Sequence, residues 1–163
     1  MKHYFIDGYN LLFRVHGKPR SLQQKRNELI HLINQEATLF NLNITLVFDG
    51  AHMDATDLVR GHFNAIEIVY TRQKQTADEY ILDELHHKTN PAIEVVITSD
   101  NQLASACKSM GAKTESIESF LSFLSNKHKK AQKKRIEQSL QKAFEDSKSN
   151  IERLLKIFES RME

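Results

Sequence analysis

The sequence predicts an α/β domain with a central parallel sheet covered on both faces by helices, followed by a helical extension. Along residues 1–125, short apolar segments of strand length alternate with longer segments in which apolar residues recur at helical spacing. Three of the strand-like segments end at or close to an aspartate: Asp7, Asp49 and Asp100. Residues 126–163 contain no proline or glycine and keep helical spacing throughout. We therefore expect a domain over residues 1–125 and a helical tail over residues 126–163.

The first half of the domain is expected to contain one long helix and three strands. The helix begins after Ser21, a good N-cap residue, and its apolar residues recur at helical spacing as far as Phe40. The span 50–64 is polar, has no clear period and is expected to be a loop. The second strand is almost continuously apolar, as buried parallel strands are, whereas the third is expected nearer an edge. The strands are expected at residues 4–6, 44–48 and 66–70.

The second half continues the alternation of helices and strands. Thr76 and Glu79 have the spacing of a capping box, which predicts a helix from Ala77 to about His87. Gly111 is a suitable residue to end the helix that Asp100 opens. The remaining elements are expected as a strand over 93–98, a helix over 101–110, a short strand over 112–114 and a helix from Ser116 to Leu124.

Several classes of protein are excluded by composition. The single cysteine, Cys107, allows neither an internal disulfide nor a thiolate-rich metal site, and no His-x-x-x-His pair suggests zinc. No apolar segment approaches the roughly 18 residues of a membrane span, and the N-terminus has no signal-peptide pattern. We expect a cytoplasmic protein that does not bind a membrane.

Charge is distributed unevenly between domain and tail. Residues 1–125 carry 12 Lys/Arg against 15 Asp/Glu, a net charge of −3, whereas residues 126–163 carry 11 against 6, a net charge of +5. Six of the tail's basic residues fall between Lys127 and Arg135, with no acid among them. This segment is either a binding surface for a polyanion or an ordinary solvated helix face.

The tail also carries an apolar stripe, which a helix in water must cover with a partner surface. The partner is the domain, a second copy of the chain in a homodimer, or another macromolecule. The stripe consists of Ile136, Leu140, Phe144, Ile151, Leu154, Leu155 and Phe158.

The aspartates that follow the strands form the candidate catalytic site. The carboxyl ends of parallel strands share one edge of the sheet, so Asp7, Asp49 and Asp100 should gather there, with Asp78 in the first turn of its helix. Taken singly, each is explained as a turn former or a helix N-terminal residue. Together they repel one another and favour Mg²⁺ or Mn²⁺, with metal-assisted phosphodiester hydrolysis as the corresponding chemistry. Asn10 lies close enough to Asp7 to position a water molecule or a phosphate.

The same residues carry a resemblance to a known family. The chain resembles the bacterial YacP-like group of NYN domains, within the PIN-like nuclease superfamily, over residues 1 to about 124. The opening motif and the Thr-Ala-Asp-Glu motif are the most specific. The matching motifs are Asp7–Leu12, Val47–Asp49, Val69–Thr71, Thr76–Glu79 and Thr98–Asp100.

The resemblance implies a three-layer PIN-like fold, a divalent metal and single-stranded RNA as the substrate. It also implies work on mRNA in the context of the ribosome. By position, Asp7, Asp78 and Asp100 would be the principal metal ligands, Asp49 a further member of the acidic pocket, and Asn10 its polar companion.

One position departs from the family pattern. Members often place a glutamate four residues after the aspartate of Thr-Ala-Asp, where this chain has Leu82. Asp83 is next in sequence but is turned by about 100° around the helix. Three alternatives follow: Asp83 serves as an auxiliary ligand, three aspartates suffice, or the site is weakened.

Two functions are compatible with these observations. The first is a metal-dependent endoribonuclease in which basic residues hold the RNA backbone. The second is a non-catalytic RNA- or ribosome-binding module with a weakened metal site. A phosphotransferase is disfavoured, because no glycine-rich phosphate loop is present. The candidate RNA-binding residues are Arg14, Lys18, Arg20, Arg72 and Lys74 in the domain and Lys129, Lys130, Lys133 and Lys134 in the tail.

Overall fold

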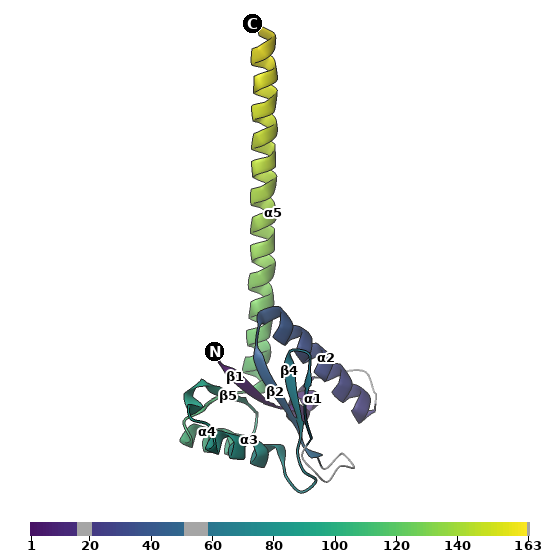
Figure 1. The fold of residues 1–163 in the computed structure, drawn as a ribbon, viewed down its shortest axis with the longest axis vertical. Coiled ribbons are helices and arrows are strands. Elements are labelled where there is room, and N and C mark those ends of the chain that lie inside the picture. Colours follow the sequence, from purple (N-terminus) through teal and green to yellow (C-terminus); the bar gives the residue numbers. More distant parts are fainter. Residues whose placement is uncertain (16–20, 51–58, 163) are drawn as a thin grey trace. The chain divides into compact units, whose positions relative to one another are not determined.

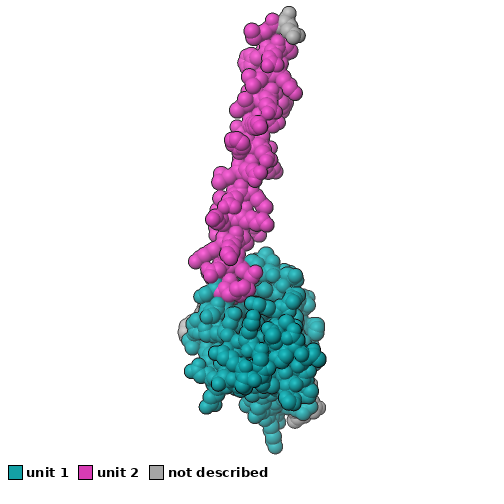
Figure 2. Space-filling view, turned by 90° about the vertical axis from the view of Figure 1, so that its left-hand side faces the viewer, with its two compact units in different colours: residues 1–122 teal, residues 123–163 magenta. Residues whose placement is uncertain are grey.

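The computed structural model describes residues 1–15, 21–50 and 59–162. These residues form two compact units, Met1–Ser122 and Phe123–Glu163, coloured separately in Figure 2. Lys18, Arg20 and most of the expected loop over 50–64 lie outside the described residues.

The first unit is built around a six-stranded, mostly parallel sheet in the order β3-β4-β2-β1-β5-β6 (Figure 1). β1 pairs in parallel with β2 and with β5, so the first strand of the chain lies at the centre of the sheet. The three-layer α/β architecture predicted from the sequence is confirmed. The strands are β1 (His3–Asp7), β2 (Asn43–Phe48), β3 (Val59–Phe63), β4 (Ile66–Tyr70), β5 (Glu94–Ile97) and β6 (Lys113–Glu115).

β3 corrects the prediction of a loop over residues 50–64. It pairs antiparallel with β4, so β4 is an inner strand rather than an edge strand. Asn64, whose φ is 51°, makes the turn between them, and the N–H of Ala65 donates to Asn34 Oδ1 at 2.9 Å. Because β3 is mostly exposed at the edge, its sequence lacks the apolar alternation by which strands are usually identified.

Helices cover both faces of the sheet. α1 (Gly8–Arg14) and α2 (Leu22–Phe40) lie on one face, and α3 (Ala77–His86) and α4 (Asn101–Ser109) on the other (Figure 1). The capping residues predicted for α2 and α3 are observed, with complete capping boxes at Ser21 and Thr76. α1 was not predicted, because the Asp-Gly pair before it is typical of a turn.

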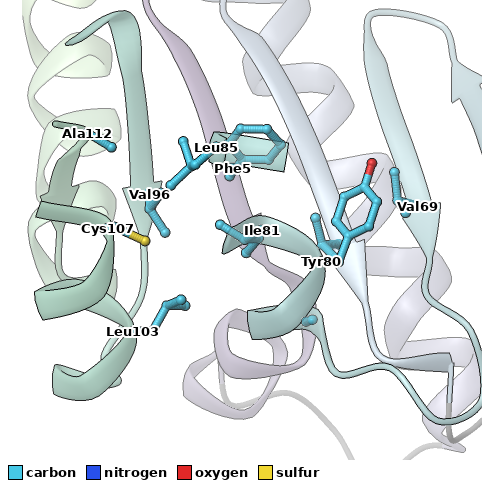
Figure 3. Close-up of a cluster of buried hydrophobic side chains, with 11 residues drawn as sticks. Phe5, Val69, Tyr80, Ile81, Leu85, Val96, Leu103, Cys107 and Ala112 are labelled. Atoms are coloured by element: carbon cyan, nitrogen blue, oxygen red, sulfur yellow. The ribbon is translucent and has the colours of Figure 1, made fainter. Parts of the chain in front are cut away.

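An apolar cluster fills the space between the sheet and the helices α3 and α4. Figure 3 shows Phe5 and Val96 of the sheet facing Ile81 and Leu85 of α3 and Cys107 of α4. Each such side chain, when fully buried, contributes about 1.5–3 kcal/mol to folding. Burial raises the pKa of the Cys107 thiol to about 11, with a smaller effect from the charge of Asp78, so this cysteine is a packing residue.

A buried polar network joins the three central strands near their amino ends. His3 Nδ1 lies 2.5 Å from Glu94 Oε2, and His3 Nε2 lies 2.8 Å from Thr45 Oγ1. Lys88 Nζ lies 3.9 Å from the other oxygen of Glu94. These contacts pair the polar atoms of β1, β2 and β5, which would otherwise be costly to bury. They lie at the end of the sheet opposite to Asp7, which ends β1.

The second unit belongs to one continuous helix, α5 (Ile117–Met162). Its basic residues Lys129, Lys130, Lys133 and Lys134 are exposed. Its exposed apolar residues include Ile136, Leu140, Phe144, Ile151, Leu155 and Phe158. No helix within the described residues is long and apolar enough to cross a bilayer.

A glycine after β2 fixes the chain next to one of the candidate site residues. A Cβ added at Gly50 would lie 1.7 Å from the carbonyl oxygen of Thr71. We therefore expect Gly50→Ala to lower the free energy of unfolding by about 1–3 kcal/mol. A Cβ at Gly61 would meet no atom within 4 Å, so Gly61→Ala is the matched control and should be neutral or slightly stabilising. Urea denaturation of the three proteins measures this, and equal midpoints would contradict it.

Candidate active site

Asp7 is at the centre of the site because it ends the central strand of the sheet. It is also the N-cap of α1, where its Oδ1 accepts a hydrogen bond from the Asn10 N–H at 3.2 Å. The carboxylate is half-buried and lies at the positive end of a short helix. Folding therefore fixes the position of Asp7 before any ligand binds.

Asn10 joins α1 to the segment that follows β5. Its Oδ1 accepts a hydrogen bond from the Ser99 N–H at 3.1 Å, which holds the chain one residue before Asp100. Asp100 is the N-cap of α4 and accepts from the N–H groups of Gln102 at 2.8 Å and Leu103 at 3.2 Å. Asn10 thus positions Asp100 relative to Asp7, a bracing contact that the sequence did not reveal.

Asp49 and Asp78 enter the site from two other elements. Asp49 follows β2 directly, and the next N–H, that of Gly50, donates to Thr71 Oγ1 at 2.9 Å. Asp78 is the second residue of α3, immediately inside the capping box. Both are half-buried.

Three of the four carboxylates line a cleft of about 350 Å³, and the fourth lies next to one of them. Asp7, Asp49 and Asp78 line it, and Asp100 is close enough to Asp78 for a side-chain hydrogen bond. The gathering of aspartates expected from the strand ends is therefore observed. The other lining residues are Tyr9, Asn10, Phe13, Thr76 and Ala77.

The carboxylates of the cleft disfavour one another's ionisation. The pKa of Asp78 is raised to about 6, first by burial, then by the charges of Asp7 and Asp100, the hydrogen bond with Asp100 and the charge of Asp49. The pKa of Asp7 is raised by burial, opposed by the Asn10 N–H, and raised further by the charges of Asp49 and Asp100. A bound cation would relieve this repulsion.

The donor atoms of the cleft fit a hard divalent cation. They are carboxylate oxygens, which Mg²⁺ and Mn²⁺ prefer, and there is no competing thiolate, since Cys107 is buried in the core. Within the described residues, no three His, Cys, Asp or Glu side chains form a ready-made metal site. Mg²⁺ commonly keeps several waters and binds through one or two carboxylates, and Asp7 and Asp78 are carboxylates that line the cleft together.

Leu82 takes the position of the glutamate expected from the family resemblance, and Asp83 follows it; neither side chain lines the cleft. Leu82 is partly buried and packs against the core cluster of Figure 3. The Asp83 side chain is 67% exposed and lies 4.0 Å from His87 Nδ1 on the same helix. Neither residue is among those that line the cleft.

The candidate RNA-binding residues occupy different environments. Arg14 forms an ion pair of 2.6 Å with Glu118, and both side chains are more than half exposed. Arg72 and Lys74 are exposed in the segment between β4 and α3. The four tail lysines belong to the second unit, and Lys18 and Arg20 lie outside the described residues.

Three residues of the site escaped sequence reasoning. Tyr9 and Phe13 line the cleft, and Arg26, only 7% exposed, donates from Nη1 to the Tyr9 hydroxyl at 3.0 Å. A signal for Arg26 was present, because it occupies the apolar face of α2 together with Leu29 and Ile33. A charged residue at such a position indicates a specific buried partner.

Comparison with known proteins agrees with this fold. A sequence model described as the YacP-like NYN domain matches residues 4–161, so the match extends through the long helix. The crystal structure of Rae1 (YacP) from Bacillus subtilis is similar at 22% sequence identity, covering 98% of this chain and 93% of that chain, with a TM-score of 0.66. The structure of its W164L mutant, also at 22% identity, covers 82% and 80% with a TM-score of 0.64. Comparison with curated proteins found no match.

The repulsion within the cleft predicts a pH-dependent stability of the metal-free protein. Because the pKa of Asp78 is about 6 when folded and about 3.9 when unfolded, the folded chain binds the proton more tightly. The contribution of Asp78 to the free energy of unfolding is therefore fully present below about pH 4 and is lost as the pH rises through about 6. Asp78→Asn should remove this loss and stabilise the metal-free protein by about 1 kcal/mol at neutral pH, after allowance for solvent screening.

Thermal unfolding in EDTA between about pH 4 and pH 7 measures the difference, because the change lies between the unfolded and folded pKa values of Asp78. Asp83→Asn, on the exposed side of the same helix, is the matched control and should follow the parent. A parent and an Asp78→Asn variant with parallel curves would show that Asp78 does not experience this repulsion.

Proposed function

The chain belongs to the YacP-like NYN domain family, and we propose that it is a divalent-metal-dependent endoribonuclease acting on single-stranded RNA. The family has a PIN-like nuclease fold, and nuclease-like NYN domains generally depend on a divalent metal. The observation that carries the proposal is that Asp7, Asp49 and Asp78 line a single cleft, with Asp100 next to Asp78.

The residues of the cleft have distinct roles in the proposed reaction. Asp7 and Asp78 face the cleft and would hold the cation, with Asp49 beside them and Asp100 adjacent to Asp78. Bound Mg²⁺ or Mn²⁺ would supply charge neutralisation at the phosphate and an activated water for hydrolysis. Asn10 keeps α1 and the Ser99–Asp100 segment together, so the carboxylates need little rearrangement during the reaction.

The RNA backbone is proposed to contact basic residues around this cleft. Arg72 and Lys74 are exposed just before α3, whose first turn carries Asp78. Arg14 lies one residue after Phe13, which lines the cleft. Release of its ion pair with Glu118 would cost little, because both side chains are exposed.

The second unit is proposed to provide the wider context of the reaction. Its basic segment would bind structured RNA, with mRNA on the ribosome in the cytoplasm as the proposed target. Its exposed apolar residues, among them Leu140, Phe144 and Phe158, would pair with a second copy of the chain or with a surface of that larger assembly.

A second function, an RNA- or ribosome-binding module without catalysis, is favoured by one specific observation. The position where relatives often place a glutamate is Leu82, which packs into the core instead of facing the cleft. The described residues also lack a ready-made cluster of three ligands. A cation held by few carboxylates would bind weakly. The protein would then still bind RNA but would not cleave it.

Asp7→Asn distinguishes the two functions. Asparagine caps a helix as well as aspartate does, so the fold should persist. We expect cleavage of a single-stranded RNA in Mg²⁺ or Mn²⁺ to fall at least about a hundredfold, since the metal supplies several kcal/mol of transition-state stabilisation. Asp83→Asn is the control and should cleave as the parent does. Cleavage by Asp7→Asn at the parental rate would overturn the proposed site, and a parent inactive in both metals would favour the binding module.

Replacing four lysines of α5 tests the tail. The change of Lys129, Lys130, Lys133 and Lys134 to Gln should weaken RNA binding at low salt and lower the salt slope by about 0.7 for each phosphate that the tail no longer neutralises. The matched control removes the same number of charges farther along the helix, with Lys142, Lys148, Arg153 and Lys156 changed to Gln. Fluorescence anisotropy between 50 and 300 mM KCl measures both slopes. If both sets change RNA binding equally, the basic segment is an ordinary solvated helix face and not a specific binding surface.

A further inference from the structure

Phe13 is an apolar side chain at the cleft that folding does not require. It is 61% exposed, whereas Tyr9, Leu11 and Leu12 of the same helix are buried. It lines the cleft together with Asp7, Asp49 and Asp78. The charges of the three carboxylates do not stabilise an apolar ring beside them. A ligand that carries both a charge and an apolar face would explain why Phe13 is exposed at this place.

The Phe13 ring is supported from one side by Tyr9. The two rings are stacked, with centroids 6.1 Å apart and planes inclined by 22°. They belong to residues four apart on α1, the spacing at which helical side chains meet. Since Phe13 remains mostly exposed, this contact leaves ring surface accessible to a ligand.

Tyr9 itself is held by contacts from two other elements. Arg26 of α2 donates from Nη1 to its hydroxyl at 3.0 Å, and the edge of its ring meets Phe48 of β2 with centroids 5.2 Å apart. Phe48 is in turn stacked on Tyr70 of β4, with centroids 5.5 Å apart. The support under Phe13 therefore reaches two strands of the sheet, and Tyr9 is only 6% exposed.

We propose that Phe13 is a stacking platform for one nucleobase of the RNA whose phosphate enters the carboxylate cleft. A nucleotide joins a flat aromatic base, which would stack on the ring, to a phosphate, which the divalent cation of the proposed function would hold beside the carboxylates. Stacking on one aromatic side chain tolerates any base, so Phe13 orients the strand without selecting its sequence. This inference rests on the proposed function for the identity of the ligand as RNA.

Substitution of Phe13 should therefore weaken binding more than chemistry. For Phe13→Ala we expect KM, and Kd measured with Ca²⁺ in place of Mn²⁺, to rise about 5- to 50-fold, with kcat changed less than about threefold. Phe13→Trp keeps a stacking surface and should bind as the parent does. Leu39→Ala is the control: Leu39 is an apolar residue of α2, 54% exposed, that does not line the cleft. Because Phe13 is exposed, circular dichroism should show all the variants folded.

Abasic RNA identifies the partner of the ring. A single abasic nucleotide, moved step by step along a short RNA, should weaken binding to the parent most strongly at one position. At that position Phe13→Ala should lose no further affinity, since the base it would stack on is already absent. Equal affinities of parent and Phe13→Ala would overturn the proposal. So would an affinity loss in Phe13→Ala that is the same at every abasic position, or a change in self-association without a change in RNA binding.

Failure of the proposed function is seen separately from failure of this inference. If the parent cleaves no RNA but shows the coupling between Phe13 and one abasic position, the proposed endonuclease activity is wrong and the stacking platform stands. A parent that cleaves RNA without this coupling keeps the activity and lacks the platform. A parent that binds no RNA overturns both.

Discussion

The constraint on which the site depends is that the carboxylates of Asp7 and Asp78 are partly buried next to other carboxylates, which disfavours their ionisation first by burial and then by charge repulsion. Parallel strands bring Asp7, Asp49 and Asp100 to the same edge, and α3 adds Asp78. The fold offsets part of the repulsion with backbone N–H groups: Asp7 and Asp100 are N-caps, and Asp78 lies in the first turn of its helix. The apolar core beneath the site keeps the N-termini of the three helices in place against the repulsion that remains.

The order of the strands explains why this edge becomes a cleft. β1 is central, and the chain builds β2 and β4 on one side of it and β5 and β6 on the other. Ligands of open α/β sheets bind at such a reversal of strand order, outside the carboxyl ends of the strands. Here Asn10 bridges the reversal by its bond to the Ser99 N–H, and Thr71 secures the chain after β2 through Gly50.

The parts of the structure that could be predicted from sequence are those specified by local pattern. Continuous apolar runs predicted β2 and β5, the N-cap residue Ser21 predicted the start of α2, and the capping box at Thr76 predicted α3. The aspartates after the strands predicted the cleft, because sheet geometry gathers them. β3 was missed because its exposed side chains carry no apolar period. α1 was missed because Gly8 favours a turn as strongly as a helix start. The contacts that link Arg26 to Tyr9 and Tyr9 to Phe13 include one between different helices, which no local sequence pattern reveals.

The packing of Leu82 has a consequence for how the site can change over time. Its side chain lies against the buried cluster that includes Ile81 and Cys107, so a glutamate there would bring a carboxylate to an apolar surface. A single substitution toward the common family residue would thus cost stability before a ligand could compensate. A glutamate at residue 82 would therefore be tolerated more easily if a neighbouring side chain of the cluster changed with it, because residues in contact have coupled effects on stability.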